Sequence, residues 1–227
     1  MKNKTSNIWD EKLALKTARI LIANKAYLVD FNKKLSEWIT WNNGIKCPVY
    51  LNCRYIYGKE NAFCMIVPYL AKMLKNSPLD FDLFVGLSTA GIPLAAAMSL
   101  RLNKPFAYVR TSKKEHGVGG LVEGDPQKGI KAIILDDTLA SGGSVIRAIE
   151  SLENEFSIKT IGVVTVASMS EFGFENKWDE LKRRNIDIMS LTNYQALQAV
   201  AVKEKLMTQQ QSNQLSQFYQ SPSKYVW

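Results

Sequence analysis

Two neighbouring carboxylates followed by a run of small residues form the segment best suited to chemistry. Asp136 and Asp137 come directly after an apolar stretch, Ile130 to Leu135. The loop that follows consists of Thr138, Leu139, Ala140, Ser141, Gly142, Gly143 and Ser144. Small residues let backbone N–H groups converge, and the helix expected over 144–156 adds the positive end of its dipole. Such a loop can hold a phosphate while the carboxylates accept hydrogen bonds from a diol, which fits ribose 5-phosphate.

Other phosphate-binding patterns do not match this segment. A P-loop needs Lys followed by Ser or Thr after its glycines, and a dinucleotide fingerprint needs Gly-x-Gly-x-x-Gly spacing. The segment has neither pattern. An acidic turn with a serine helix cap would contain the same residue types without binding a ligand. On these residues alone, a sugar-phosphate site and an acidic turn both remain open.

A charged and glycine-rich stretch, residues 111–129, is the second candidate for chemistry. Arg110 precedes it, and it contains Lys113, Lys114 and His116. Long loops in compact domains are usually functional or disordered. Cations on such a loop could stabilise the negative charge of a leaving group. A run of charges is, however, more often a solvated surface.

Strands that alternate with helices from residue 81 onward must position these two segments. The expected strands are 81–87, 106–110, 130–135, 160–167 and 186–191. The expected helices are 92–102, 144–156 and one that follows residue 167. The strands are continuous Val/Ile/Leu runs, which is typical of parallel strands buried on both faces. The pattern predicts an α/β fold with a doubly wound, mainly parallel sheet.

The N-terminal and C-terminal regions have a different organisation. Turn-forming Asn42, Asn43 and Gly44 predict a hairpin that pairs residues 37–41 with 49–54. Further helices are expected at 10–25, with Asp10 as its cap, at 59–75, and as a short docked helix near 206–218.

Composition limits the class of protein. The chain has 227 residues, of which 46% are hydrophobic, so one full-sized core is expected. The net charge of +8 fits ordinary solubility or an anionic partner, but no nucleic-acid-binding motif is present. Three cysteines without a Cys-x-x-Cys pair favour a reducing compartment, and we expect the cytoplasm. The N-terminus does not resemble a signal peptide, and glycines and a proline break the uncharged stretch 83–100, which argues against a membrane span.

Five segments, in the same order along the chain, resemble type I phosphoribosyltransferases. Ile133–Ser144 looks like their motif for phosphoribosyl pyrophosphate (PRPP). Trp41–Arg54, Gly86–Ala95 and Arg110–Gly120 are similar to the N-terminal segment, the pyrophosphate-side loop and the mobile catalytic loop of the orotate-specific members. The ending, Phe218–Trp227, also resembles the end of many members. The resemblance implies a single domain, 1–227, with an N-terminal helix and hood (about 1–58), an α/β core (about 59–200) and a C-terminal helix and tail (about 201–227).

The resemblance also implies roles for individual residues. Asp136 and Asp137 would hold the ribose hydroxyls, and the loop 138–144 would bind the 5-phosphate. The pyrophosphate would be bound by Arg110, Lys113, Lys114 and His116. The catalytic residues would be Lys114, His116 and Asp137. Members of the family use Mg²⁺ that PRPP carries, without direct protein ligands, and act as homodimers with shared active sites.

The base is the least determined part of the prediction. The resemblance assigns base contacts to Asn42, Asn43, Gly44 and Ser168. Many members have an arginine at the position of Ser168, and lysines at those of Thr111 and Ala90.

Our leading hypothesis is the transfer of the phosphoribosyl group to orotate, which gives orotidine 5-phosphate for pyrimidine synthesis. The alternatives are an enzyme for a different base and a catalytically weak PRPP-binding regulator. Such a regulator would sense PRPP and bind RNA or DNA. It is not favoured, because a protein that only senses PRPP has no need of the cations Lys114 and His116.

Overall fold

The sheet at the centre of the molecule confirms the expected α/β class. The computed structural model describes residues 10–40, 44–112, 120–169, 177–222 and 224–227. Within them, a six-stranded sheet has the order β10-β9-β8-β5-β6-β7. All neighbours in it are parallel except β6 and β7. Its strands are β5 (Leu83–Leu87), β6 (Phe106–Val109), β7 (Val122–Glu123), β8 (Lys131–Leu139), β9 (Lys159–Ser168) and β10 (Asp187–Asn193).

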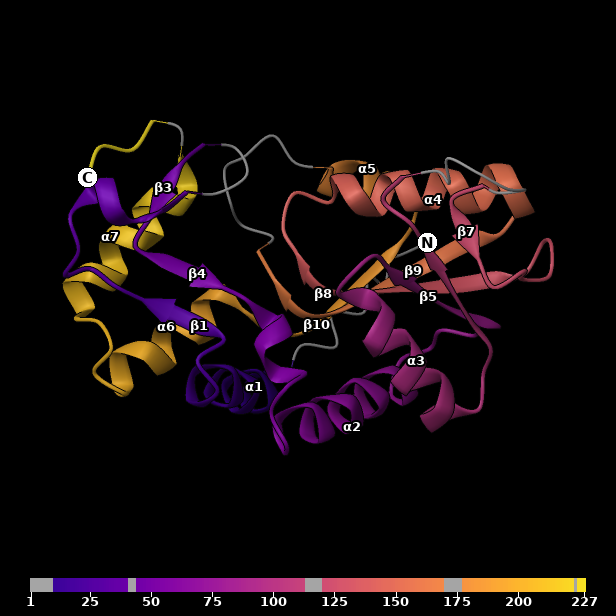
Figure 1. The fold of residues 1–227 in the computed structure, drawn as a ribbon, viewed down its shortest axis with the longest axis horizontal. Helices are drawn as coiled ribbons and strands as arrows, with labels where there is room; N and C mark the ends of the chain where they lie inside the picture. The colour runs from indigo at the N-terminus through magenta and orange to yellow at the C-terminus, as the bar shows by residue number, and fades with distance from the viewer. Residues whose placement is uncertain (1–9, 41–43, 113–119, 170–176, 223) are drawn as a thin grey trace, which may run out of the picture.

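Helices cover both faces of this sheet (Figure 1). One face carries α1 (Glu11–Ala23), α2 (Ala62–Lys75), α3 (Gly91–Leu102) and α6 (Tyr194–Lys203). The other carries α4 (Gly143–Phe156) and α5 (Trp178–Arg183). Two separate apolar clusters lie on the two faces, because strands such as β5 bury side chains on both sides. The sheet is therefore doubly wound, as its Val/Ile/Leu runs predict.

The hood pairs its strands differently from the predicted hairpin. The short strand β2 (Ile39–Thr40) pairs with β3 (Lys46–Cys47), whereas β4 (Val49–Leu51) pairs with β1 (Tyr27–Val29). The prediction that 37–41 pairs with 49–54 was therefore wrong. Pro48 lies between β3 and β4 and has no N–H for a ladder. Its carbonyl instead accepts from the N–H of Asp30 at 2.8 Å, which directs the chain into the second pair. Two 3₁₀ turns complete the hood: η1 (Leu35–Glu37) and η2 (Cys53–Ile56).

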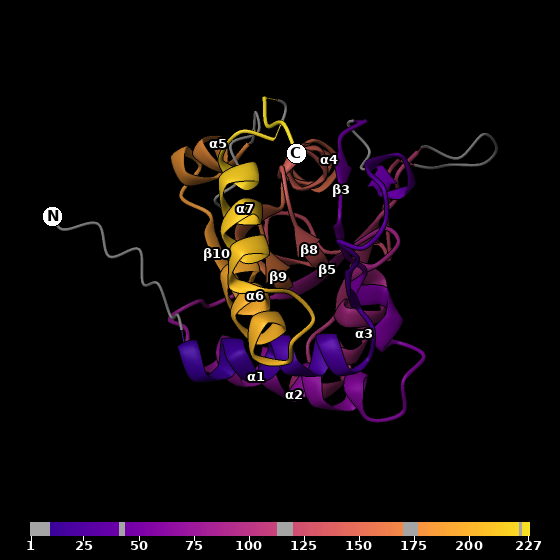
Figure 2. The ribbon, with the colours of Figure 1, turned by 90° about the vertical axis from the view of Figure 1, so that its left-hand side faces the viewer.

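The ends of the described chain pack on this framework. Asp10 caps α1 as predicted, since its Oδ1 accepts from the N–H of Leu13 at 3.0 Å. The expected C-terminal helix is α7 (Gln209–Gln220), whereas α6 was not predicted. Figure 2 shows α6 and α7 running along one side of the molecule. The last residue, Trp227, lies with its ring centroid 4.8 Å from that of Trp38, so the tail contacts the hood. No helix in the described part of the chain has the length and apolar character needed to cross a membrane.

Candidate functional site

The acidic pair lies where β8 extends beyond its neighbour β5. Pairing of β8 with β5 ends at Leu135, but pairing with β9 continues through Thr138 and Leu139. The strand therefore ends at Leu139 rather than at Leu135, and the prediction that a loop begins at Thr138 was wrong. Continued hydrogen bonding to β9 holds the backbone extended. As a result, Asp136 and Asp137 are presented from a strand, and their positions are more rigid than a loop would give.

Burial changes the acidity of both carboxyl groups. Burial and the neighbouring Asp137 charge raise the pKa of Asp136 to about 8. Burial also raises the pKa of Asp137, and the charge of Arg54 is the largest influence in the opposite direction. The backbone N–H of Asp137 donates to Asp136 Oδ1 at 2.9 Å, which fixes the carboxyl group of Asp136 beside the backbone of its neighbour. Two carboxylates this close cannot both ionise easily, so the pair is prepared for a ligand that brings hydrogen-bond donors or a cation.

A tight turn and a helix start follow the pair. The turn, Ala140–Gly142, is shorter than predicted, and Gly142 has φ of +80°, a conformation that favours glycine. Its carbonyls are already bonded: Trp178 Nε1 donates to that of Ala140 and the N–H of Lys177 to that of Ser141, both at 2.7 Å. The N–H groups of the first turn of α4 lack intrahelical partners. This arrangement can bind an anion such as a phosphate, as the sequence predicts.

Two further segments reach the same end of β8. From the hood, Cys53 Sγ accepts a hydrogen bond from Thr138 Oγ1 at 3.5 Å. Tyr57 donates its hydroxyl hydrogen to the carbonyl of Ala90, in the turn between β5 and α3. Burial, with Asp137 the next cause, raises the pKa of Tyr57, so it remains a donor. The hood, the β5–α3 turn and β8 therefore meet around the acidic pair.

A hollow beneath the start of α4 collects other predicted residues. Arg110 and Ser144 line it together with Ser88, and Arg147 adds a second guanidinium group. Arg110 Nη1 lies 3.4 Å from Glu123 Oε1, so part of its charge is already paired. The structure thus brings Arg110 and Ser144 together at the carboxyl ends of the strands.

The remaining predicted residues are distributed as follows. Ser168 is buried at the end of β9, opposite Leu139. Gly44 is exposed in the turn between β2 and β3. Asn42, Asn43, Lys113, Lys114 and His116 lie outside the described residues.

Residues of the turn after β4 were not predicted as part of the site. Cys53 and Arg54 are the last two residues of the segment Trp41–Arg54 whose similarity was noted, and Tyr57 follows it three residues later; this similarity is the only signal in the sequence that pointed toward them. Among the described residues, no three His, Cys, Asp or Glu side chains lie close enough together to hold a metal ion on their own.

Comparisons with known proteins identify the family to which this chain is similar. Residues 57–205 match the model of the phosphoribosyl transferase domain. The orotate phosphoribosyltransferase of Listeria monocytogenes (strain EGD-e) is 34% identical over 85% of this chain and 90% of its own length. That of Bacillus mycoides is 30% identical over 83% of this chain and 88% of its own length. Among solved structures, orotate phosphoribosyltransferase from Aeropyrum pernix aligns with a TM-score of 0.68 and 25% identity, over 84% of this chain and 98% of that one. Leishmania donovani UMP synthase aligns with a TM-score of 0.73 and 21% identity, over 91% of this chain and 42% of the synthase.

Proposed function

Because the chain belongs to the phosphoribosyltransferase family, we propose that it transfers the phosphoribosyl group of PRPP to orotate, giving orotidine 5-phosphate and pyrophosphate. The observation that carries this proposal is the acidic pair on β8, followed at once by the turn 140–142 and the start of α4. That order matches a ligand with a diol beside a phosphate. The similarity to orotate phosphoribosyltransferases over most of the chain identifies the base.

The reaction develops positive charge on the sugar and negative charge on the leaving group, and the site has residues that can stabilise each. The bond from the anomeric carbon to the pyrophosphate oxygen breaks, and pyrophosphate leaves with the electron pair. A bond to the base nitrogen forms, and that nitrogen loses its proton. Positive charge that develops on the sugar is stabilised by Asp136 and Asp137, which hold its hydroxyls. Negative charge on the leaving group would be stabilised by Arg110, Lys113, Lys114 and His116.

The acidic pair also fits a magnesium ion carried by PRPP. Mg²⁺ in proteins is usually bound through one or two carboxylates together with substrate phosphates and water. In our proposal PRPP carries the ion and no protein side chain coordinates it directly; the charges of Asp136 and Asp137 would attract it through bound water, and a nearby cation would lower their raised pKa values. When bound, the ion would neutralise charge on the departing pyrophosphate.

We also propose a homodimer with shared active sites and a cytoplasmic location for this single domain. Family resemblance supports the dimer, whose subunits would share their active sites. The free thiols of Cys47, Cys53 and Cys64 support a reducing compartment.

The first prediction concerns the base. With PRPP and Mg²⁺ present, the protein should consume orotate, and it should show weak or no activity with hypoxanthine, guanine and adenine. The Michaelis constant for orotate should be raised relative to relatives that have an arginine at the position of Ser168. Ultraviolet absorbance follows orotate directly. Clear turnover of another base without orotate turnover would refute the substrate assignment. No turnover of any base, with PRPP still bound, would favour the regulator instead.

The second prediction concerns protons. Since the pKa of Asp136 is about 8 in the free protein, this carboxyl group is largely protonated at pH 7. Donors from the ribose diol and a nearby cation favour the carboxylate, so PRPP binding should release a fraction of a proton at pH 7 and almost none at pH 9.5. PRPP affinity should rise between pH 6.5 and pH 8.5. Calorimetry in two buffers with different ionisation enthalpies measures the release. Equal heats in both buffers at pH 7 would contradict the prediction.

A further inference from the structure

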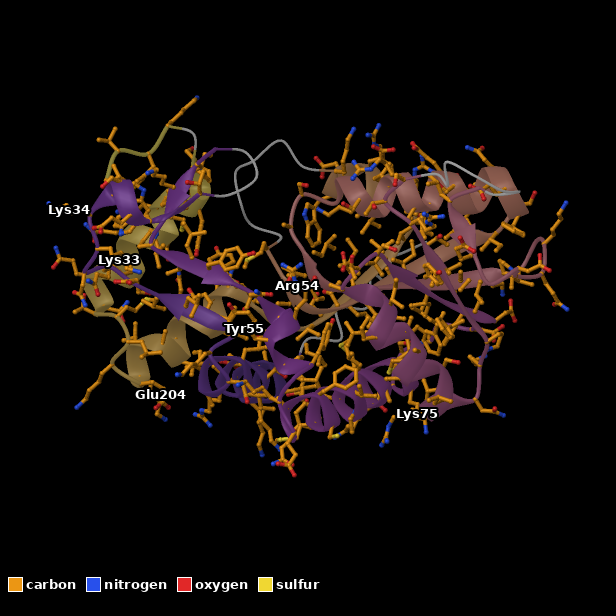
Figure 3. The ribbon with its side chains drawn as sticks, in the orientation of Figure 1. Lys33, Lys34, Arg54, Tyr55, Lys75 and Glu204 are labelled. Atoms are coloured by element: carbon orange, nitrogen blue, oxygen red, sulfur yellow. The ribbon has the colours of Figure 1, made fainter. Side chains whose placement is uncertain are left out.

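The turn η2 brings an arginine from the hood to the ribose-binding carboxylates. Arg54 follows Cys53, whose sulfur accepts the hydrogen bond from Thr138 Oγ1 at 3.5 Å. The turn therefore lies over the end of β8, one residue beyond the acidic pair. Figure 3 places Arg54 in the middle of the molecule, between the hood and the α/β core.

The guanidinium group of Arg54 has most of its donors available. Its side chain is exposed, and its Nε donates to Asn52 Oδ1 at 3.1 Å, which orients the group from one edge. Within the described part of the chain, no carboxylate lies within ion-pair distance of it. The two Nη groups, with four N–H donors, therefore have no carboxylate partner among those residues.

The charge of Arg54 nevertheless acts on the site. It opposes the rise in the pKa of both carboxyl groups of the pair. An arginine that is close enough to influence Asp136 and Asp137, but not bonded to them, is positioned for a third group that binds between them.

Orotate provides such a group. Its carboxylate is attached to the carbon next to the nitrogen that attacks the sugar, so it arrives beside the ribose. Two other residues of this region are less suitable partners for this carboxylate. Ser168 has no charge, and Lys46 donates its Nζ to the carbonyl of Ser36. A guanidinium group can bind a carboxylate through two parallel hydrogen bonds, which a lysine cannot do.

We propose that Arg54 determines specificity by binding the carboxylate of the base, and so compensates in part for the arginine that the sequence lacks at position 168. This inference rests on the proposed function, since it requires an acidic base. It assigns the selection of the base to the hood, whereas the α/β core binds PRPP.

Two product nucleotides that differ only in this carboxylate test the proposal. Binding of orotidine 5-phosphate and of uridine 5-phosphate is measured by calorimetry for the wild type, Arg54→Gln and Arg54→Lys. Lys75→Gln serves as the matched control, because it removes one exposed positive charge at the far end of α2 (Figure 3). Thermal unfolding confirms that each variant is folded.

The wild type should prefer orotidine 5-phosphate, and Arg54→Gln should reduce that preference by about 10- to 150-fold, the range for one charged hydrogen-bonding contact. Arg54→Lys should have an intermediate preference, and Lys75→Gln should behave as the wild type. An unchanged preference in Arg54→Gln would overturn the proposal. An equal loss for both nucleotides would also overturn it, because Arg54 would then act on the ribose carboxylates. Failure of the proposed function itself is distinguishable: the wild type would show no preference and no orotate turnover.

Discussion

Replacing both Asp136 and Asp137 by asparagine should abolish PRPP binding and leave the protein folded. Each carboxylate can accept charge-assisted hydrogen bonds from the ribose hydroxyls, and each such bond contributes about 1.5–3 kcal/mol. Loss of both predicts an affinity decrease of at least about a hundredfold. Calorimetric titration with PRPP and Mg²⁺ measures the loss. Unchanged affinity in the folded double variant would show that the ribose binds elsewhere.

The same substitution should also make the thermal stability of the ligand-free protein fall less as the pH rises. A carboxyl group whose pKa is raised on folding stabilises the folded state below its unfolded pKa, and this contribution is lost as pH rises through the folded pKa. For Asp136, the loss extends from its ordinary value, 3.8, to about 8. The double variant should therefore retain more of its thermal stability between pH 5 and pH 8.5 than the wild type does.

A matched control separates the site from a general effect of charge. Asp80→Asn with Asp179→Asn also removes two carboxylates, but their side chains are 91% and 88% exposed. This control should bind PRPP as the wild type does. Its stability should have the same pH dependence as that of the wild type, because exposed ion pairs contribute little.

Gly91→Ala is expected to be the most damaging single methyl addition in the core. A Cβ at residue 91 would lie 2.0 Å from the carbonyl oxygen of Leu135 and 3.3 Å from the Cα of Asp136. These are backbone atoms of β8, which cannot move aside as a flexible side chain could. The first turn of α3 would have to move away from the strand that presents the acidic pair. We expect a loss of about 1–3 kcal/mol in the free energy of unfolding or more, together with weaker PRPP binding.

Urea unfolding measures this effect, and Gly58→Ala is its control. A Cβ at Gly58 would meet no atom within 4 Å, so that variant should unfold at the wild-type urea concentration. Alanine favours a helix over glycine by about 0.5–1 kcal/mol, so a harmless site at the start of α3 would make Gly91→Ala slightly stabilising. A midpoint for Gly91→Ala at or above that of the wild type would show that α3 and β8 are not in this close contact.

The α/β core and the turn between β8 and α4 were predictable because their signals are local. The runs in β5, β8 and β9 are apolar without interruption, and each is followed by a turn and a helix. Such patterns depend on neighbours within a few residues, and parallel strands place their carboxyl ends on one edge whatever the remainder of the chain does. The sequence alone therefore places the acidic pair and the start of α4 at the same edge of the sheet.

Pairing between distant segments was not predictable in the same way. Tyr27–Val29 is only three residues long, and its partner Val49–Leu51 comes later in the chain, after β2 and β3. Nothing local distinguishes this pairing from the hairpin that was expected. The extension of β8 to Leu139 likewise depends on β9, a separate strand that continues to bond after β5 has ended.

The sequence by itself thus determined the fold class and the family resemblance, since these follow from short patterns of residue types. Only the tertiary structure decided which side chains share the site and what state their protons are in. Nothing in the sequence distinguishes Arg54 as a base contact, and it becomes a candidate for that role only because η2 packs on Thr138. The pKa of Asp136 rises because the folded chain removes water from it and holds Asp137 beside it. Both effects act through space between groups that meet only in the folded chain, so no local pattern could encode them.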